Sequence, residues 1–186
     1  MLNNLPPSSG KLLISEPFML DPNFKRSVIL LTEHNEKGSV GFVLNNKSNF
    51  FLSDLVDGFD GMEYQVYTGG PVAPDTLHFL HAMGDYLGDG VEVFPGIFWG
   101  GNFETLKILI AKNMIPEDKI KFFMGYAGWG TGQLESEIEQ NSWLVSSTKP
   151  SLVFSDSEKE LWGETVQNMG SKYSIMVNFP ENPNLN

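Results

Sequence analysis

The segment from Gly125 to Glu135 holds the residues with the clearest chemical potential in this chain. An apolar run precedes it and a short acidic amphipathic segment follows it, an order that predicts strand, glycine-rich turn and helix. Free backbone N–H groups and the helix dipole at such a junction can hold a phosphate or carboxylate, and an aromatic ring could stack on the ligand. The candidate ligand-binding residues here are Gly125, Tyr126, Gly128, Trp129, Gly130, Gln133 and Glu135.

The glycine spacing does not match the known nucleotide-binding loops. Gly125 and Gly130 have the separation found in nucleoside-triphosphate loops, but Thr131-Gly132 follows where lysine and serine or threonine are needed. The dinucleotide pattern requires glycine where Gln133 stands. A structural crossover, with both aromatic side chains packed in the core, explains the same residues. The sequence leaves these two interpretations open.

Other polar residues could support acid–base chemistry. His34 ends a predicted strand and could act as a general base near neutral pH. Glu135 paired with His34 or with Asp21 would serve a general acid/base or metal-assisted enzyme. Asp21 with Arg26 is more typical of a structural ion pair or cap, although both are kept as site candidates.

The remaining motifs do not predict a metal or a nucleophile. His78 and His81 are three residues apart in a predicted strand, so their side chains should point to opposite faces. The nucleophile pattern Gly-x-Ser-x-Gly and the zinc pattern His-Glu-x-x-His do not occur. We therefore predict no catalytic residue, no metal site and no cofactor from motifs alone.

Composition indicates a globular protein of the cytoplasm. The chain has 186 residues, 41% hydrophobic and 19% charged, which suits one domain with a substantial core. No apolar stretch approaches the roughly 20 residues that span a bilayer, so no membrane association is expected. The polar start lacks the features of a secretory signal, and there are no cysteines for disulfides or thiolate chemistry.

The charge balance argues against nucleic acid as a partner. Twenty-three acidic and twelve basic residues give a net charge of −11. Affinity for nucleic acids depends largely on lysine and arginine at phosphates, and the pairs Lys25-Arg26 and Lys119/Lys121 do not extend into a patch. The charge distribution therefore argues against direct DNA binding.

Periodicity predicts one mixed domain with more strand than helix. Two nearly continuous apolar strands should form a central hairpin around Asn35 to Gly38. The capping-box pattern at Ser155 to Glu158 predicts the start of a helix with a buried stripe from Leu161 to Met169. The predicted strands are 11–15, 28–34, 40–44, 64–68, 76–82, 91–93, 97–99, 120–124, 142–146, 151–154 and 173–177, and helices are predicted at 51–56, 102–112, 134–140 and from 155.

Several blocks in order resemble the AlgH (YqgE) family of bacterial proteins. They begin with Gly10-Lys11-Leu12-Leu13-Ile14-Ser15 and continue through Pro17 to Val28, His34, Gly38 to Asn46, Gly69-Gly70-Pro71-Val72 and Phe123 to Glu135. The resemblance implies an α+β single domain with a strongly bent mixed sheet, partial barrel closure and several flanking helices. We assign residues 1–9 to a flexible leader, 10–178 to this domain and 179–186 to a loose tail.

The family carries the label of a transcriptional regulator, and it supplies no catalytic residues to carry over. With the acidic charge, we expect a regulatory or binding protein without catalysis that acts through a small molecule or a protein partner. The glycine segment, His34 and the Gly69-Gly70 turn would line its site, with Asn45 from the resembling blocks added. The alternatives are the acid–base enzyme described above and a DNA-binding regulator.

Overall fold

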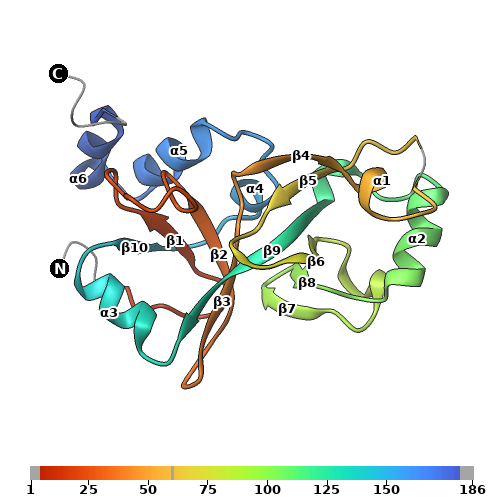
Figure 1. Ribbon diagram of the computed structural model, residues 1–186, viewed down its shortest axis with the longest axis horizontal. Coiled ribbons are helices and arrows are strands. Elements are labelled where there is room, and N and C mark those ends of the chain that lie inside the picture. The colour runs from red at the N-terminus through yellow and green to blue at the C-terminus, as the bar shows by residue number, and fades with distance from the viewer. Residues whose placement is uncertain (1–4, 60, 181–186) are drawn as a thin grey trace.

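The computed structural model describes residues 5–59 and 61–180. Their strands form one ten-stranded mixed sheet in the order β10-β1-β2-β3-β9-β6-β8-β7, and β4 joins it through β5, which pairs with β9 (Figure 1). The strands are β1 Leu12–Ser15, β2 Val28–Asn35, β3 Gly38–Val43, β4 Lys47–Phe51, β5 Gln65–Thr68, β6 Val72–His81, β7 Val91–Phe94, β8 Ile97–Trp99, β9 Ile120–Gly130 and β10 Trp143–Ser146.

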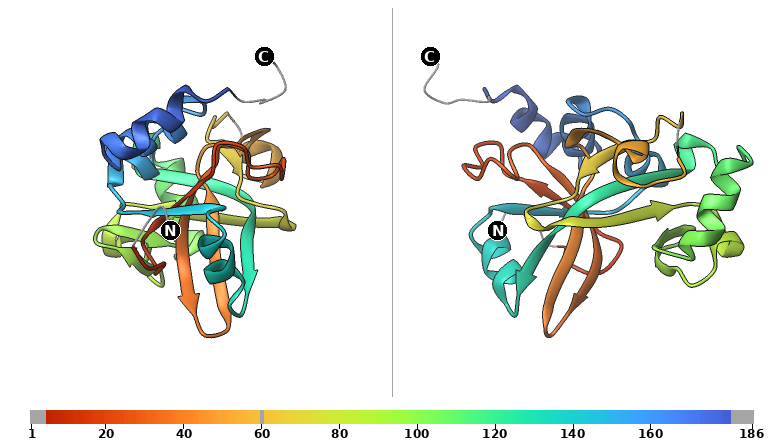
Figure 2. Two further views of the ribbon diagram at one scale, coloured as in Figure 1. Left: turned by 90° about the vertical axis from the view of Figure 1, so that its left-hand side faces the viewer. Right: turned by 45° about the vertical axis from the view of Figure 1, so that its right-hand side comes forward.

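Helices surround this sheet on several sides (Figures 1 and 2). The long ones begin where the sequence predicts a cap or a buried stripe. Asn102, for example, accepts a hydrogen bond from the backbone N–H of Thr105 at the start of α2. The helices are α1 Leu52–Leu55, α2 Phe103–Ala111, α3 Gln133–Glu139, α4 Pro150–Val153, α5 Glu160–Asn168 and α6 Ser171–Ser174, with single 3-10 turns at Gly84–Leu87, Glu117–Lys119 and Ile175–Asn178.

Strand β9 joins the two halves of the sheet. Its first half pairs with β5 in parallel and with β6 antiparallel, while its last residues, Ala127 to Gly130, pair with β3. Figure 1 shows β9 crossing the molecule diagonally between these halves. The expected bent, mixed sheet of an α+β domain is confirmed. Among the described strands the sheet stays open, with β10 and β7 at its ends, so the predicted barrel closure does not occur.

Glycines permit β9 to bend where another backbone crosses it. Gly125 has φ +63°, and a Cβ atom placed there would lie 2.7 Å from the carbonyl oxygen of Gly70. A Cβ at Gly70 would lie 2.2 Å from the carbonyl carbon of Tyr126, and one at Gly69 would lie 2.4 Å from the oxygen of Gly125. Side chains would clash at these separations, so this crossing of two backbones requires glycine.

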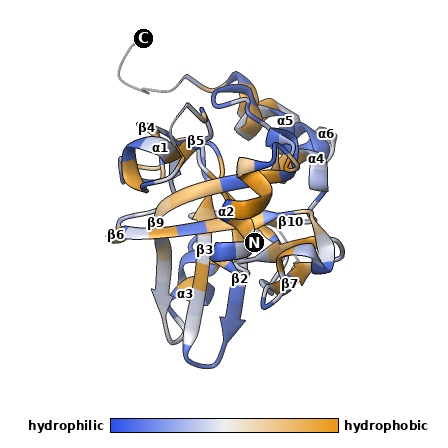
Figure 3. Cartoon of the chain, turned by 90° about the vertical axis from the view of Figure 1, so that its right-hand side faces the viewer, coloured by the Kyte–Doolittle hydropathy of each residue, from blue (hydrophilic) through white to orange (hydrophobic). Residues whose placement is uncertain are grey.

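The hydrophobic interior has three clusters that follow the two halves of the sheet. The largest lies under α4 and α5, a second lies between α2 and β5, β6 and β9, and a third lies between the other face of β1 and β2 and helix α3. Figure 3 shows α2 as a mostly hydrophobic helix and the tip of the β2–β3 hairpin as hydrophilic. The helices therefore bury apolar stripes against the sheet, as their sequences predict.

Three predictions of local structure are wrong. The glycine segment is mostly strand, because β9 extends to Gly130 and the turn is only Thr131-Gly132. Residues 151–154 and 173–177 are largely helical rather than extended. Pro150 occupies the first turn of α4, where its fixed φ favours a helix, and runs this short carry no reliable period. Helix α5 is confirmed but begins at Glu160, after the predicted capping box.

Candidate functional site

The two aromatic residues of the glycine segment lie among core side chains. Trp129 is only 6% exposed and contacts Phe24 and Trp143. Tyr126 is half-buried against the largest core cluster, with its ring 5.9 Å from the ring of His78. Gly128 and Gly130 occupy exposed positions of β9 on either side of Trp129. The structural crossover, which the sequence left open, describes this arrangement.

The carboxylate of Glu137 ties α3 to β9 and β10. The indole N–H groups of Trp129 and Trp143 both donate to Glu137 Oε2, at 2.9 and 2.8 Å, and the Gln133 amide donates to Oε1 at 2.9 Å. Gln133 in turn accepts from the backbone N–H of Gly130 at 3.0 Å. The polar groups at the start of this acidic helix therefore make internal contacts. The sequence analysis did not assign this structural role to Glu137.

His34 and Glu135 lie side by side, although they are far apart in the sequence. His34 Nε2 is 3.6 Å from Glu135 Oε1, and His34 Nδ1 is 2.8 Å from Ser39 Oγ. The pairing of β2 with β3 places Ser39 opposite His34, and α3 brings Glu135 to them. Ser39 is only 4% exposed, so its hydroxyl has no room for a substrate. The accessible part of this group is the His34–Glu135 pair.

Asp21, Arg26 and Asn45 belong to the loop between β1 and β2 and to the segment after β3. Asp21 caps a turn by accepting hydrogen bonds from the backbone and side-chain N–H groups of Asn23, both at 2.9 Å. The Arg26 guanidinium lies over the Trp162 ring, 4.7 Å from its centroid, and donates to the carbonyl oxygen of Phe179. The capping interpretation of Asp21 thus matches its contacts.

Lys121 is a buried cation that sequence analysis did not single out as a functional candidate. Its ammonium donates hydrogen bonds to the carbonyl oxygens of Leu44, Val153 and Ser155 and lies 4.1 Å from the centroid of the Tyr67 ring. Burial lowers the pKa of Lys121 to about 7, with repulsion from Lys47 adding to the effect. The sequence signal that could have identified Lys121 was the presence of a lysine at an inward-facing position of an otherwise apolar strand.

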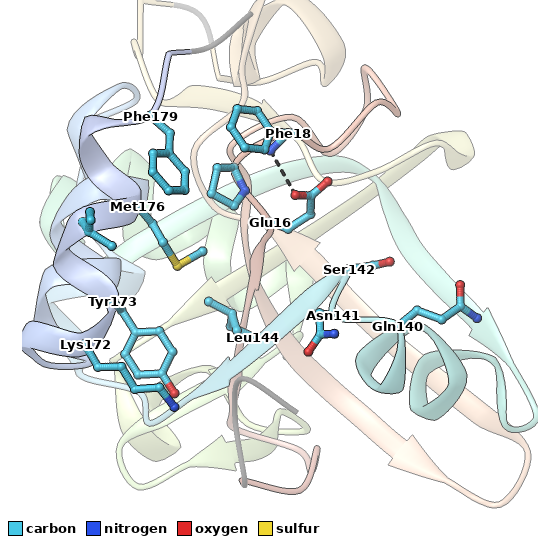
Figure 4. Close-up of a pocket in the computed structure, with 12 residues that line it drawn as sticks. Glu16, Phe18, Gln140, Asn141, Ser142, Leu144, Lys172, Tyr173, Met176 and Phe179 are labelled. Atoms are coloured by element: carbon cyan, nitrogen blue, oxygen red, sulfur yellow. Dashed lines mark hydrogen bonds between the residues drawn. The ribbon is translucent and has the colours of Figure 1, made fainter. Parts of the chain in front are cut away.

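A cavity of about 540 Å³ opens between β10, the loop after β1 and the helical segment α6 with the 3-10 turn that follows it (Figure 4). Most of the side chains around it are apolar or aromatic, and we call it the apolar cavity. Its lining residues are Glu16, Pro17, Phe18, Gln140, Asn141, Ser142, Leu144, Lys172, Tyr173, Ile175, Met176 and Phe179.

The apolar cavity has a buried floor and a polar rim. Leu144 and Met176 are buried at its floor, and the rings of Phe18 and Phe179 stack at 5.5 Å on one side. Glu16 bends the adjoining loop by accepting a hydrogen bond from the backbone N–H of Phe18 at 3.1 Å, which Figure 4 shows. Lys172 and Asn141 contribute polar groups to the lining. This arrangement can hold an apolar molecule that carries a few polar groups.

The sequence analysis missed the apolar cavity because three distant segments form it. Pairing of β1 with β10 brings the loop after Ser15 beside residue 142, and the backbone N–H of Glu16 donates to Ser142 O at 3.0 Å. Phe179 completes the wall, although it was assigned to a loose tail. The one local signal was a phenylalanine at the start of that tail, which a solvent-exposed segment does not need.

Two features of the described residues bear on possible partners. In the described part of the chain, no helix is long and apolar enough to cross a membrane. Within residues 5–59 and 61–180, no group of three or more histidines and carboxylates is placed to hold a metal ion.

Comparisons with known proteins point to one family. A family model described as AlgH-like matches residues 12–174. A UPF0301 protein of Chlorobaculum tepidum is 45% identical over 177 residues, covering 95% of both chains, and one of Bacteroides thetaiotaomicron is 38% identical over 185 residues, covering 99% of this chain and 94% of the relative.

Two solved structures share the fold. The solution structure of the AlgH protein from Pseudomonas aeruginosa has a TM-score of 0.73 and 30% identity, covering 97% of this chain and 98% of that one. The crystal structure of protein DIP2367 from Corynebacterium diphtheriae has a TM-score of 0.77 at 24% identity, with 96% and 95% covered.

Proposed function

This chain belongs to the AlgH-like family, and we propose that it is a non-catalytic regulatory protein that binds a small, largely apolar molecule in the apolar cavity. The cavity itself is the observation that carries the proposal. Its volume of about 540 Å³ falls within the roughly 300–1,000 Å³ of small-molecule sites, which are mostly apolar with a few polar groups.

The wall of the cavity supports a regulatory role. Phe179 follows the last helical turn and is held from outside by Arg26, while its ring stacks on Phe18. A ligand that contacts these rings would therefore also contact the segment that leads to the C-terminal end of the described chain. Such a ligand could change the surface that this segment offers to a protein partner.

The acidic net charge of the chain supports regulation without direct contact to DNA. A net charge of −11 opposes the phosphate backbone, so the proposed regulation passes through the ligand and a protein partner in the cytoplasm. The transcriptional label of the family would then describe an indirect effect. Electrophoretic retention of duplex DNA by the pure protein at physiological salt would contradict this part of the proposal.

The apolar cavity can be tested with a neutral fluorescent probe. We expect N-phenylnaphthylamine to bind the full chain saturably, and Phe18→Ala to weaken that binding at least about fivefold, since a stacked aromatic contact contributes roughly 1 kcal/mol. Tyr86→Ala is the matched control, because Tyr86 is 77% exposed and lies outside the cavity. Absence of saturable binding, or equal binding by both variants, would refute the cavity as the ligand site.

A second candidate function rests on the His34–Glu135 pair. His34 Nε2 and Glu135 Oε1 are 3.6 Å apart, an ion-pair separation longer than a hydrogen bond, and a small movement of either side chain would let the carboxylate orient the imidazole as a general base. The experiment is hydrolysis of a panel of p-nitrophenyl esters by the wild type, His34→Gln and Glu135→Gln. Turnover that both substitutions remove would favour the enzyme. Rates equal to those of buffer, or unchanged in both variants, would eliminate it.

A further inference from the structure

A second cavity, of about 410 Å³, lies beside the loop before β2 and the segment before α5. We call it the polar cavity, and it shares no lining residue with the apolar cavity. Its walls hold three cationic side chains and three asparagines against a single carboxylate, that of Glu158. The lining residues are Pro22, Asn23, Lys25, Arg26, Ser27, Asn45, Asn46, Glu158 and Lys159.

The lining of the polar cavity is positively charged, although the whole chain has a net charge of −11. Only twelve basic residues occur in the chain, and Lys25, Arg26 and Lys159 are gathered here. A concave surface lined mainly by one sign of charge attracts ligands of the opposite sign. The three cations also come from two separate segments, so their convergence is a product of the tertiary structure.

The backbone at Arg26 is held in an unfavourable conformation. Arg26 has φ +47°, a left-handed backbone conformation that a bulky side chain rarely adopts. The guanidinium Nε is buried and has no hydrogen-bond partner among the described residues. The fold therefore keeps this arginine in place without satisfying all of its donors, a pattern that is typical of binding sites.

Asn45 fixes the two walls of the polar cavity to each other. Its amide group donates to the carbonyl oxygens of Arg26 at 2.9 Å and Glu158 at 3.2 Å, while its oxygen accepts from the backbone N–H of Val28 at 2.9 Å. A single side chain thus secures the strained turn and the segment before α5. The site is organised before any ligand arrives, which reduces the cost of binding.

We propose that the polar cavity binds the phosphoryl group of a small molecule. A phosphate dianion brings about two negative charges and several acceptor oxygens, which match the cationic side chains and the amide groups of Asn23 and Asn46 in the lining. The volume exceeds that of inorganic phosphate, so the organic part of the ligand also fits inside. This inference does not depend on the occupant of the apolar cavity.

The experiment is titration of the full chain with phenyl phosphate and with succinate, followed by backbone amide chemical shifts. We expect saturable shifts at Asn45, Asn46 and Lys159 with phenyl phosphate. Lys159→Gln should weaken binding at least about tenfold, a loss of about 1.4 kcal/mol, because it removes a charge-assisted hydrogen bond to the phosphoryl group. Lys159 is exposed, so its loss should leave the fold intact, and Lys119→Gln is the matched control at an exposed site outside the cavity lining.

The outcomes separate this proposal from its alternatives. No saturable shift up to about 20 mM phenyl phosphate, where even a Kd of 1–10 mM would be visible, would overturn it. Equal weakening by both lysine substitutions would show only a general charge effect and would also overturn it. Succinate binding in place of phenyl phosphate would replace the phosphoryl group by a dicarboxylate. Binding restricted to a phosphopeptide would replace the small molecule by a protein.

Discussion

Replacing Glu137 by alanine should destabilise the protein by about 2–6 kcal/mol. The substitution removes the acceptor of two indole N–H groups, and the residues that carry them, Trp129 and Trp143, are 6% and 2% exposed. A buried donor left without a partner costs about 1–3 kcal/mol. Two such donors give the expected range, and the lost bond from Gln133 lies at the exposed end of the helix and adds little.

The assay is equilibrium unfolding in urea followed by tryptophan fluorescence. The midpoint should fall while the slope m stays constant, because the surface exposed on unfolding is unchanged. Glu137→Gln should show an intermediate loss, since it keeps one neutral acceptor oxygen. Glu139→Ala is the matched control on an exposed face of the same helix and should stay within about 0.5 kcal/mol of the wild type. A loss below about 1 kcal/mol for Glu137→Ala would mean that water replaces the carboxylate, and the argument would be refuted.

The structure also predicts how substitutions at three other positions change stability. Gly70→Ala should lower the free energy of unfolding in urea by more than about 3 kcal/mol, because its Cβ would lie 2.2 Å from the backbone of Tyr126. Gly132→Ala, in open space at φ +69°, should lower it by only about 1–2 kcal/mol. Similar losses for the two variants would contradict the close backbone crossing at Gly70. Burial lowers the pKa of Lys121 from 10.5 to about 7, so between these pH values the folded state binds fewer protons than the unfolded state. The free energy of unfolding should therefore rise across that range by up to about 1.4 kcal/mol per pH unit. Lys121→Met should abolish this rise, measured by unfolding at a series of pH values. Burial also lowers the pKa of His81 below 6.5, so the unfolded state binds the proton more tightly and stability should fall as the pH drops below about 6.5. His81→Asn should reduce this loss of stability at acid pH in thermal melts. An unchanged loss would assign it to other titrating groups.

The two cavities lie on either side of one arginine. Arg26 contributes to the polar cavity, and its guanidinium donates to Phe179, whose ring is part of the apolar cavity. An anion that drew this guanidinium away would remove one of the contacts that hold Phe179. The arrangement offers a physical route by which the two proposed sites would influence each other.

Several features of this protein could be read from the residues alone. The continuous apolar runs of β2 and β3 predicted a central hairpin, and both strands lie in the middle of the sheet. Asn102 predicted the start of α2, and the stripe from Leu161 predicted the buried face of α5. Caps and apolar periodicity are local signals that the fold did not override. The blocks that resemble AlgH also predicted the family correctly.

The glycine segment illustrates a local signal that was misread. Ala127 and Trp129 are buried and alternate with the exposed Gly128 and Gly130, which is the period of a strand. The density of glycine suggested a turn instead. Within this segment it is Gly125 that contacts another backbone, at Gly69 and Gly70, and sequence alone does not reveal which segments approach each other.

Sequence by itself determined the composition of the core, most of the strands, the acidic charge and the family of this protein. Tertiary structure decided which polar groups meet. His34 reaches Glu135, Glu137 joins two tryptophans, and three cations converge around Arg26 only because strand pairing and helix packing bring distant segments together. Local patterns depend on the nearest few residues, whereas a cavity depends on contacts between segments that the chain separates by a hundred positions or more. Both proposed sites are of that second kind.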